Sequence, residues 1–215
     1  MGKNILITGG LGYIGTELCK IYSGETWKNN IIVIDNRFSS ERVRQLNEWG
    51  IKFIHGDILD RNFVDKNLNN ADIVHHLAGI TDVARTSTES NSDKDKILNL
   101  VAIQGTSNVL ASMNDNSKII FASTHVIYEG IKSLKKNILE EETPRPILAY
   151  ASSKYENEKQ IKNSGKNYVI LRLGSVHGYS NDSTRLDIMP NLFSKISSQN
   201  GTINLYSGGT QLKSL

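Results

Sequence analysis

A glycine-rich segment near the N-terminus constrains this chain more than any other part of its sequence. The segment 8–15 follows a short apolar run and opens a stretch with helical periodicity, residues 12–23. Its glycines Gly9, Gly12 and Gly15 permit a tight turn, close approach of the backbone to a bound group, and close packing of a helix on a strand. The first N–H groups of that helix would then face an anion such as a pyrophosphate. The segment therefore predicts a dinucleotide site, although a glycine-rich turn without a ligand is the alternative.

An acidic residue supports the dinucleotide interpretation. Asp35 ends a second apolar run about 20 residues beyond the glycine loop, where a carboxylate accepts hydrogen bonds from the adenosine ribose hydroxyls. Because a carboxylate at this position repels a 2′-phosphate, the sequence predicts NAD in preference to NADP. Arg37 keeps the opposite preference open, since a nearby arginine can hold a 2′-phosphate.

Short apolar runs alternate with helical patterns along the rest of the chain. We expect strands at 4–8, 31–34, 51–54, 73–76, 118–122 and 168–173, and helices at 12–23, 39–49, 60–68, 94–113 and 148–163. This alternation predicts an α/β fold, a Rossmann-type doubly wound parallel sheet covered by helices on both faces. The charged segment 129–146 interrupts the pattern and predicts a functional loop.

Composition argues against several other classes of protein. The net charge of +3 is small and the charges are mixed, so we expect neither a nucleic-acid nor a membrane partner. No apolar run is long enough to cross a bilayer and no signal peptide is evident, so a cytoplasmic location is the expectation. Cys19 is the only cysteine, and the five histidines lack metal-ligand spacing, so we expect no disulfide and no metal site.

A tyrosine and a lysine provide the candidate chemistry. Tyr150 and Lys154 stand four residues apart, on one face of the predicted helix 148–163. A free tyrosine has a pKa near 10, and a neighbouring ammonium favours the phenolate that could accept a proton. Such a pair also occurs on ordinary exposed helices, but this one follows the fifth predicted strand and the long loop.

Hydroxyl groups at the end of the fifth strand are the next candidates. Ser123 or Thr124 could hydrogen-bond a substrate oxygen there, or could simply cap the turn that follows. His125 is a possible base, but a lone histidine is more often structural.

Together these motifs resemble the extended short-chain dehydrogenase/reductase superfamily and, within it, the NAD-dependent sugar epimerase/dehydratase family. The glycine loop looks like the family's TGGxGYIG, and the remaining matches follow in the family's order and spacing. They are Asp35-Asn36, Gly56-Asp57-Ile58, His76-Leu77-Ala78-Gly79, the segment 105–110, the residues Glu142, Pro144 and Pro146, and Tyr150–Lys154.

The resemblance implies a role for each matched position. Tyr150 would be the base toward a sugar hydroxyl, Lys154 would lower its pKa and hold the nicotinamide ribose, and Thr124 would give a second hydrogen bond to the reacting oxygen. Thr124, Ser175 and Lys213 would contact a nucleotide-sugar substrate. The implied NAD contacts are Gly9, Gly12, Tyr13, Ile14, Gly15, Asp35, Asn36, Asp57, Ile58, Leu77, Ala78, Gly79, Tyr150 and Lys154.

Departures from the family pattern reduce the number of reactions that this chain is expected to catalyse. Family dehydratases carry Asp-Glu directly after the catalytic threonine, whereas this chain has His125 and Val126, which argues against a 4,6-dehydratase. Ser175 stands where the family has asparagine, and Lys213 where it has arginine. We expect an NAD-binding domain at 1–175 and the start of a substrate-binding lobe at 176–215, a lobe that looks cut short compared with the family.

The sequence thus predicts an NAD-dependent nucleotide-sugar epimerase, 4-epimerase-like, acting through a transient keto-sugar. The alternatives are an NAD(P)H-dependent keto-sugar reductase and a truncated dinucleotide-binding module without turnover. The resemblance also implies a homodimer, built by the helices 94–113 and 148–163.

Overall fold

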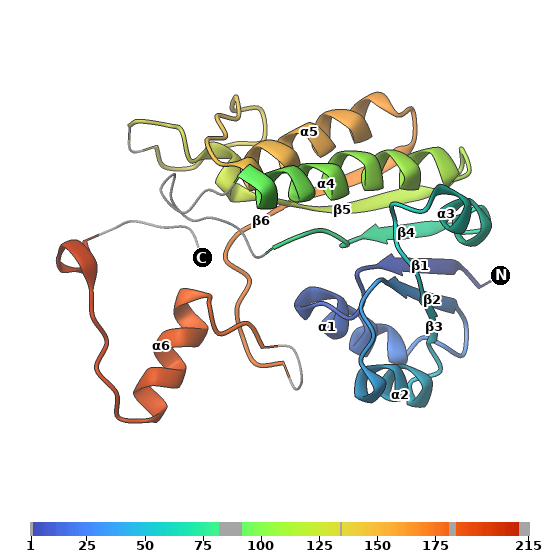
Figure 1. Ribbon diagram of the computed structural model, residues 1–215, viewed down its shortest axis with the longest axis horizontal. Coiled ribbons are helices and arrows are strands. Elements are labelled where there is room, and N and C mark those ends of the chain that lie inside the picture. Colours follow the sequence, from blue (N-terminus) through green and yellow to red (C-terminus); the bar gives the residue numbers. More distant parts are fainter. Residues whose placement is uncertain (1, 82–91, 134, 181–183, 211–215) are drawn as a thin grey trace.

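A computed structural model describes residues 2–81, 92–133, 135–180 and 184–210 (Figure 1). At its centre is a six-stranded sheet in the order β3-β2-β1-β4-β5-β6, with every neighbouring pair parallel. The strands are β1 (Asn4–Thr8), β2 (Asn30–Asp35), β3 (Lys52–His55), β4 (Ile73–His76), β5 (Lys118–Thr124) and β6 (Asn167–Leu173). The chain winds outward from β1 in one direction and from β4 in the other, which confirms the doubly wound fold expected from the sequence.

Helices cover both faces of the sheet (Figure 1). One face carries α1 (Tyr13–Ser23) and α2 (Ser40–Glu48), and the other carries α3 (Arg61–Leu68), α4 (Ser92–Ser112) and α5 (Ala149–Asn163). Each face has its own apolar core. The first is centred on Ile5, Ile7, Cys19, Ile31, Val33 and Leu46, and the second on Leu6, Ile34, Val64, Val74, Val109, Ile119, Phe121 and Ile161. The alternation of these residues along β1 and β2 explains why both strands are apolar throughout.

The expected elements agree with the observed ones to within two residues at each end. Three short helices were not expected: η1 (His125–Tyr128), α6 (Met189–Ser198) and η2 (Tyr206–Gly209). The single turn η1 begins at the Thr124 cap, where the side-chain oxygen accepts the Val126 N–H.

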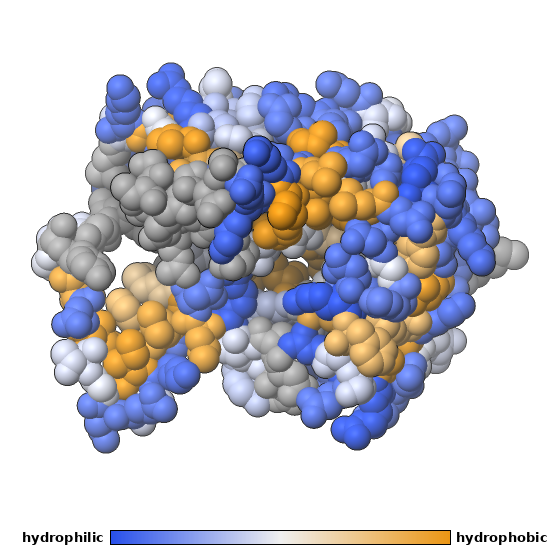
Figure 2. Space-filling view, viewed as in Figure 1, coloured by the Kyte–Doolittle hydropathy of each residue, from blue (hydrophilic) through white to orange (hydrophobic). Residues whose placement is uncertain are grey.

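The chain leaves the sheet after β6. Helix α6 lies apart from the sheet (Figure 1), and none of its residues is buried. Apolar side chains such as Met189 and Leu192 are exposed on it, and Figure 2 shows apolar surface in this part of the molecule. The division of the chain after residue 175 remains a prediction. Within the described part of the chain, no helix has both the length and the apolar character that crossing a bilayer requires.

A buried histidine joins three elements at the carboxyl edge of the sheet. His76, at the end of β4, contacts Thr8 Oγ1 through Nδ1 at 2.8 Å and Thr106 Oγ1 on α4 through Nε2 at 3.0 Å. Burial, together with the charge of Lys154, lowers the pKa of His76 to about 3. The ring is therefore neutral, with one nitrogen donating and the other accepting.

His75, the preceding residue, is also buried. Its Nε2 lies 2.8 Å from the Tyr22 hydroxyl, and the two rings meet edge to face at 5.6 Å. Burial lowers the pKa of His75 to about 4.

We predict that the folded state loses stability as the pH falls below about 6.5. Unfolded histidine titrates near pH 6.5, so from there down to about pH 4 the unfolded chain binds more protons than the folded one. Each buried histidine should lower the free energy of unfolding by up to about 1.4 kcal/mol per pH unit. Urea denaturation between pH 7 and pH 5 measures this slope.

In this experiment His76→Asn should reduce the slope, whereas His177→Asn, at an exposed position, should leave it unchanged. An equal slope in the parent and in His76→Asn would contradict the assignment of His76 as a neutral buried ring.

Candidate active site

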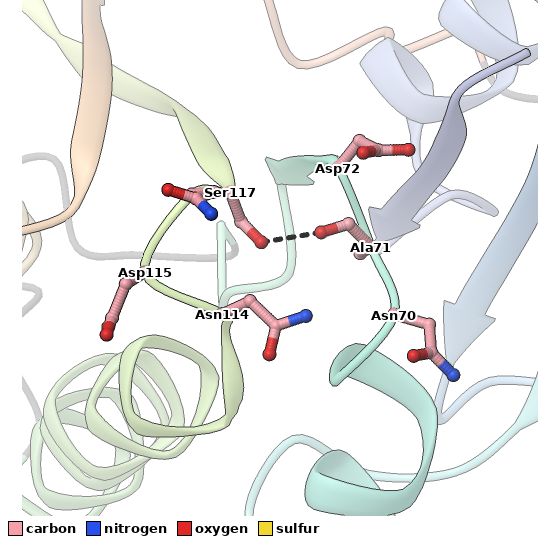
Figure 3. A pocket seen from close by; sticks show the side chains of 7 residues that line it. Asn70, Ala71, Asp72, Asn114, Asp115 and Ser117 are labelled. Carbon is pink, nitrogen blue, oxygen red and sulfur yellow. Dashed lines mark hydrogen bonds between the residues drawn. The ribbon is translucent and has the colours of Figure 1, made fainter. Parts of the chain in front are cut away.

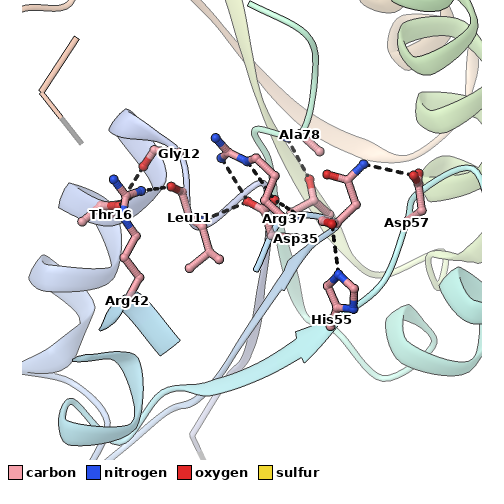
Figure 4. A network of polar contacts seen from close by, with 11 residues as sticks. Leu11, Gly12, Thr16, Asp35, Arg37, Arg42, His55, Asp57 and Ala78 are labelled. Atoms are coloured by element: carbon pink, nitrogen blue, oxygen red, sulfur yellow. Dashed lines mark hydrogen bonds and ion pairs between the residues drawn. The ribbon is translucent and has the colours of Figure 1, made fainter. Parts of the chain in front are cut away.

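The glycine loop lies at the carboxyl end of β1 and touches the neighbouring strands (Figure 4). Gly9 has a φ of 72°, and its N–H donates to Ile34 O at 2.7 Å. A Cβ on Gly9 would lie 2.6 Å from the backbone nitrogen of Ala78, so only glycine fits. Gly12 is the N-cap of α1 and has no side chain to accept from the first-turn N–H groups, and that turn contains no acidic residue. The N-terminus of α1 is therefore suited to an anionic group.

Asp35 ends β2 and directs its carboxylate at this loop (Figure 4). The side chain is buried, and Oδ2 accepts the Leu11 N–H at 3.0 Å. Oδ1 accepts the Arg37 N–H at 3.0 Å and pairs with Arg37 Nε at 3.3 Å. The arginine that kept the cofactor preference open thus lies on the carboxylate, with most of its side chain exposed.

The next predicted residues follow on the neighbouring strand end. Asn36 Nδ2 donates to Asp57 Oδ2 at 3.0 Å, and the Leu59 N–H donates to Asp57 Oδ1 at 2.9 Å. Ile58 is buried in the core, and its carbonyl accepts from Asn108 Nδ2 at 2.9 Å. The side chain and carbonyl of Ile58 are thus engaged within the protein.

The segment after β4 runs along the other side of the glycine loop. The Leu77 N–H donates to Thr8 O at 3.1 Å, and the Ala78 N–H to Thr8 Oγ1 at 3.2 Å. Gly79 is exposed, and a Cβ there would meet nothing within 4 Å. The glycine loop, the buried acid and this segment lie along one edge, so the residues present fit a dinucleotide such as NAD.

Tyr150 and Lys154 lie in the first turns of α5. Lys154 Nζ donates to Ala122 O on β5 at 2.9 Å and lies 4.6 Å above the Phe121 ring. The same nitrogen is 5.9 Å from the centre of the Tyr150 ring. Burial lowers the pKa of Lys154 to about 8, and burial raises the pKa of Tyr150. The cation that opposes the rise at Tyr150 is Arg185.

The two hydroxyl residues at the end of β5 have separate partners. Thr124 is buried, and its Oγ1 accepts the Val126 N–H at 3.3 Å, so it does cap the turn. Its hydroxyl proton can still be donated to another oxygen. Ser123 donates instead to Glu158 Oε1 on α5 at 2.6 Å. His125 Nδ1 contacts Leu173 O at 3.1 Å, which is a structural contact.

The predicted substrate residues follow β6. Ser175 is half-buried, and its carbonyl contacts His177 Nδ1 at 2.8 Å. Lys213 lies outside the described residues. The Tyr13 hydroxyl, predicted at the cofactor, donates to Gly178 O at 2.5 Å and thereby links the glycine loop to this segment.

Two residues near the site escaped the sequence analysis. Arg185 pairs with Asp187 at 2.6 Å and donates to Thr81 O at 3.4 Å, and its charge acts on Tyr150. Asn191 on α6 accepts the Gly178 N–H at 2.9 Å and donates to Arg185 O at 2.8 Å. Both follow β6: Arg185 lies in irregular chain and Asn191 on a helix that was not expected, and neither belongs to a motif that would indicate its position.

A polar hollow lies at the opposite edge of the sheet, before β4 and β5 (Figure 3). Several of its polar groups already have partners. Ser117 Oγ donates to Ala71 O at 2.6 Å, Asp72 accepts the Asn4 N–H at 2.7 Å, and Asp115 pairs with Lys166 at 2.6 Å. Among the described residues, no group of His, Cys, Asp or Glu is arranged to hold a metal ion. The candidate site is therefore at the carboxyl edge.

Known proteins resemble this chain along most of its length. It is 30% identical over 190 residues to a putative UDP-glucose 4-epimerase of Methanocaldococcus jannaschii, which covers 83% of this chain and 57% of that protein. It is 32% identical over 142 residues to CDP-paratose 2-epimerase of Salmonella typhi, which covers 62% of this chain and 40% of that protein. The chain thus spans about half the length of these relatives.

The fold has a solved counterpart. The UDP-glucuronic acid 4-epimerase of Bacillus cereus, solved with UDP-glucuronic acid and NAD, superimposes with a TM-score of 0.79 at 25% identity, over 97% of this chain and 67% of that one. The sequence model of the NAD dependent epimerase/dehydratase family matches residues 5–215. This match confirms the family resemblance expected from the motifs, and the chain belongs to the NAD dependent epimerase/dehydratase family.

Proposed function

We propose that this chain provides the cofactor site and the acid–base residues of a nucleotide-sugar epimerase that inverts carbon 4 through a transient keto-sugar. The observation that carries the proposal is the hydrogen bond from Lys154 Nζ to Ala122 O at 2.9 Å. It fixes α5 beside the end of β5, so that Tyr150 and Lys154 share a sheet edge with Thr124 and the glycine loop. Relatives named as 4-epimerases support this choice, and His125 and Val126, in place of the Asp-Glu of the family's dehydratases, argue against a 4,6-dehydratase.

The proposed NAD contacts follow from the edge described above. The N-terminus of α1 would receive the pyrophosphate at Gly12, Tyr13, Ile14 and Gly15. Asp35 would accept from the adenosine ribose hydroxyls, since its carboxylate already faces the loop. When bound, NAD supplies a reversible acceptor for a hydride from the sugar.

In this proposal Tyr150 accepts the proton of the sugar hydroxyl and later returns it. Because burial raises its pKa, the phenol needs positive charge nearby to release its proton at neutral pH. Arg185 provides part of that charge, and Lys154 carries its own charge at pH values below about 8. The Thr124 hydroxyl donates a second hydrogen bond to the reacting oxygen, and Ser175 and Lys213 contact the substrate.

We predict that the chain binds NAD⁺ more tightly than NADP⁺. In Asp35→Asn the charged acceptor is lost, and hydrogen bonds to charged groups contribute about 1.5–3 kcal/mol, so NAD⁺ affinity should fall at least about tenfold. Titration calorimetry with both dinucleotides measures the two affinities. Glu41→Gln, which removes an exposed acid from α2, is the matched control for net charge. Equal or tighter binding of NADP⁺ would reassign the determining role to Arg37.

We predict that Tyr150→Phe reduces turnover of a nucleotide sugar by about 10²–10⁴-fold, the usual contribution of a positioned acid–base group. NAD⁺ affinity should change little because the ring is retained. Thr124→Val should lose less, since it removes one hydrogen bond and leaves the base. Steady-state kinetics on a panel of UDP-, CDP- and dTDP-sugars measures these effects.

Tyr155→Phe, on the same helix, is the matched control and should keep parental turnover. Parental kcat in Tyr150→Phe would refute the catalytic assignment. Net oxidation of NADH or NADPH by the parent enzyme would indicate the keto-sugar reductase instead. Cofactor binding without any turnover would favour the dinucleotide-binding module.

We also propose a homodimer, in which α4 and α5 of two chains pack together. Ile97 and Leu100 on α4 support this, because 56% and 54% of their surfaces are exposed. We predict a dimer mass by light scattering at micromolar concentration, and a monomer for Leu100→Glu. Trp27→Glu, which alters an exposed apolar residue outside α4 and α5, should remain dimeric. A monomeric parent chain would contradict the proposal.

A further inference from the structure

Glu158 is a buried acid that the proposed chemistry does not use. It follows Lys154 by one helical turn and Tyr150 by two, so the three side chains share one face of α5. Its relative exposure is 0%, and its carboxylate accepts from Ser123 Oγ at 2.6 Å and from Arg172 Nη2 at 2.7 Å. Burial alone would raise the pKa of Glu158, but the bonds from Arg172 and Ser123 hold it below its usual range. The group is therefore a carboxylate at neutral pH.

Arg172, its partner on β6, hydrogen-bonds to several neighbouring elements. Its Nε also donates to Glu158 at 3.0 Å, which makes the pair two-pronged. Its Nη1 donates to Glu140 O at 2.8 Å and to the Tyr128 hydroxyl, above whose ring the guanidinium lies at 5.4 Å. Tyr128 ends the turn that Thr124 caps, and Glu140 belongs to the loop that leads to Tyr150.

The pair is thus connected to every element that carries a proposed catalytic residue. Through Ser123 it reaches the residue beside Thr124, and through the helix face it reaches Lys154 and Tyr150. Lys162 Nζ, on α5, lies 3.9 Å from the same carboxylate, so the acid has a second cation nearby. All of these contacts lie on the α5 side of the β5 and β6 ends.

Stability alone gives little reason for an ion pair here. Taking two charges out of water costs about as much as their attraction returns, and apolar replacements of similar volume are often neutral or stabilising. What an apolar contact lacks is direction: a carboxylate held by a hydroxyl and a planar guanidinium admits one orientation. Such a pair suits a task in which the position of a helix matters.

We propose that the Glu158–Arg172 pair is a positioning unit that holds Tyr150 and Lys154 in register with Thr124. The inference rests on the proposed function, because it concerns the same three residues. The N-terminal end of α5 is fixed separately, since Glu129 Oε1 accepts the Ile147 and Leu148 N–H groups at 2.8 and 2.7 Å. The pair fixes the helix almost three turns further on, and a 1 Å error in such a site can cost about 10²-fold in rate.

The test is the double variant Glu158→Leu with Arg172→Met, which removes both charges and leaves neither unpaired. We expect circular dichroism close to that of the parent, but a kcat lower by about 10²-fold with little change in KM for the nucleotide sugar. NAD⁺ affinity should also fall, because Lys154 is proposed to hold the nicotinamide ribose. A second readout is independent of turnover. Burial raises the pKa of Tyr150, so a loosened helix should lower the Tyr150 titration midpoint, followed by NMR of 13C-labelled tyrosine.

The control is Arg61→Met with Asp65→Leu on α3, an ion pair in which Arg61 Nε lies 2.8 Å from both carboxylate oxygens and Ser112 also donates to Asp65. This pair is about half exposed and lies on a helix that carries no proposed catalytic residue. The control should move neither kcat nor the Tyr150 midpoint. Arg172→Lys keeps the positive charge but lacks the planar guanidinium, so kcat should fall by less than in the double variant. If the double variant fails to fold, Arg172→Lys is compared with the parent instead.

A double variant with parental kcat and an unchanged Tyr150 midpoint would overturn the proposal and make the pair purely structural. A shifted midpoint combined with parental kcat in Tyr150→Phe has a different meaning. In that case the proposed function fails, while the control of the Tyr150 position by Glu158 and Arg172 stands.

Discussion

The parallel direction of all six strands is the constraint on which the rest of the structure depends. Thr8 is paired with Ile34 and His76 in register, and Thr124 with Leu173, so these strand ends come together at one edge. Because helices bury both faces, the strands themselves must be largely apolar, and polar groups gather where the strands stop. The glycine loop, Asp35 and the hydroxyl of Thr124 meet there for this topological reason, although they are far apart in the chain.

Two buried titratable groups near Lys154, His76 and Glu158, differ in their charge state because they have different partners. His76 has only hydroxyl partners in Thr8 and Thr106, so burial keeps it neutral and adds no second cation beside Lys154. Glu158 has a guanidinium partner and is ionised. Among the described residues, no buried side-chain nitrogen or oxygen lacks a hydrogen-bond partner. Each charge state at this edge therefore follows from the partner that the fold supplies.

Much of this arrangement follows from local sequence. The apolar runs predict the strands because the central ones, β1, β2, β4 and β5, are largely buried, whereas the edge strands β3 and β6 are partly exposed. The glycine loop with Asp35 predicts the dinucleotide edge. The spacing of Tyr150 and Lys154 places both on one helix face, but the Ala122 carbonyl that fixes Lys154 is a contact between distant segments. Pairwise contacts of this kind have no local signature.

Other residues of the site were not predicted from the sequence. Glu158 continues the spacing of Tyr150 and Lys154 by one more turn, and an acid on that face was a detectable signal. Arg172, inside an apolar strand, was another, since a charge buried in a sheet needs a partner. Arg185 and Asn191 gave no signal, because they lie in irregular chain or on α6, a helix that buries no residue.

The glycines of the loop are required for different reasons. A Cβ on Gly10 would lie 2.5 Å from the Val33 side chain, and one on Gly15 would lie 2.6 Å from Gly9 O, so the protein's own packing demands both. A Cβ on Gly12 would meet its nearest atom, Gly9 O, at 3.1 Å, a contact that a small shift could relieve. A related protein that no longer bound a dinucleotide would still need glycine at positions 10 and 15, but could accept other residues at position 12. The residue at position 12 would then distinguish a chain that still binds a dinucleotide from one that keeps only the shape of the loop.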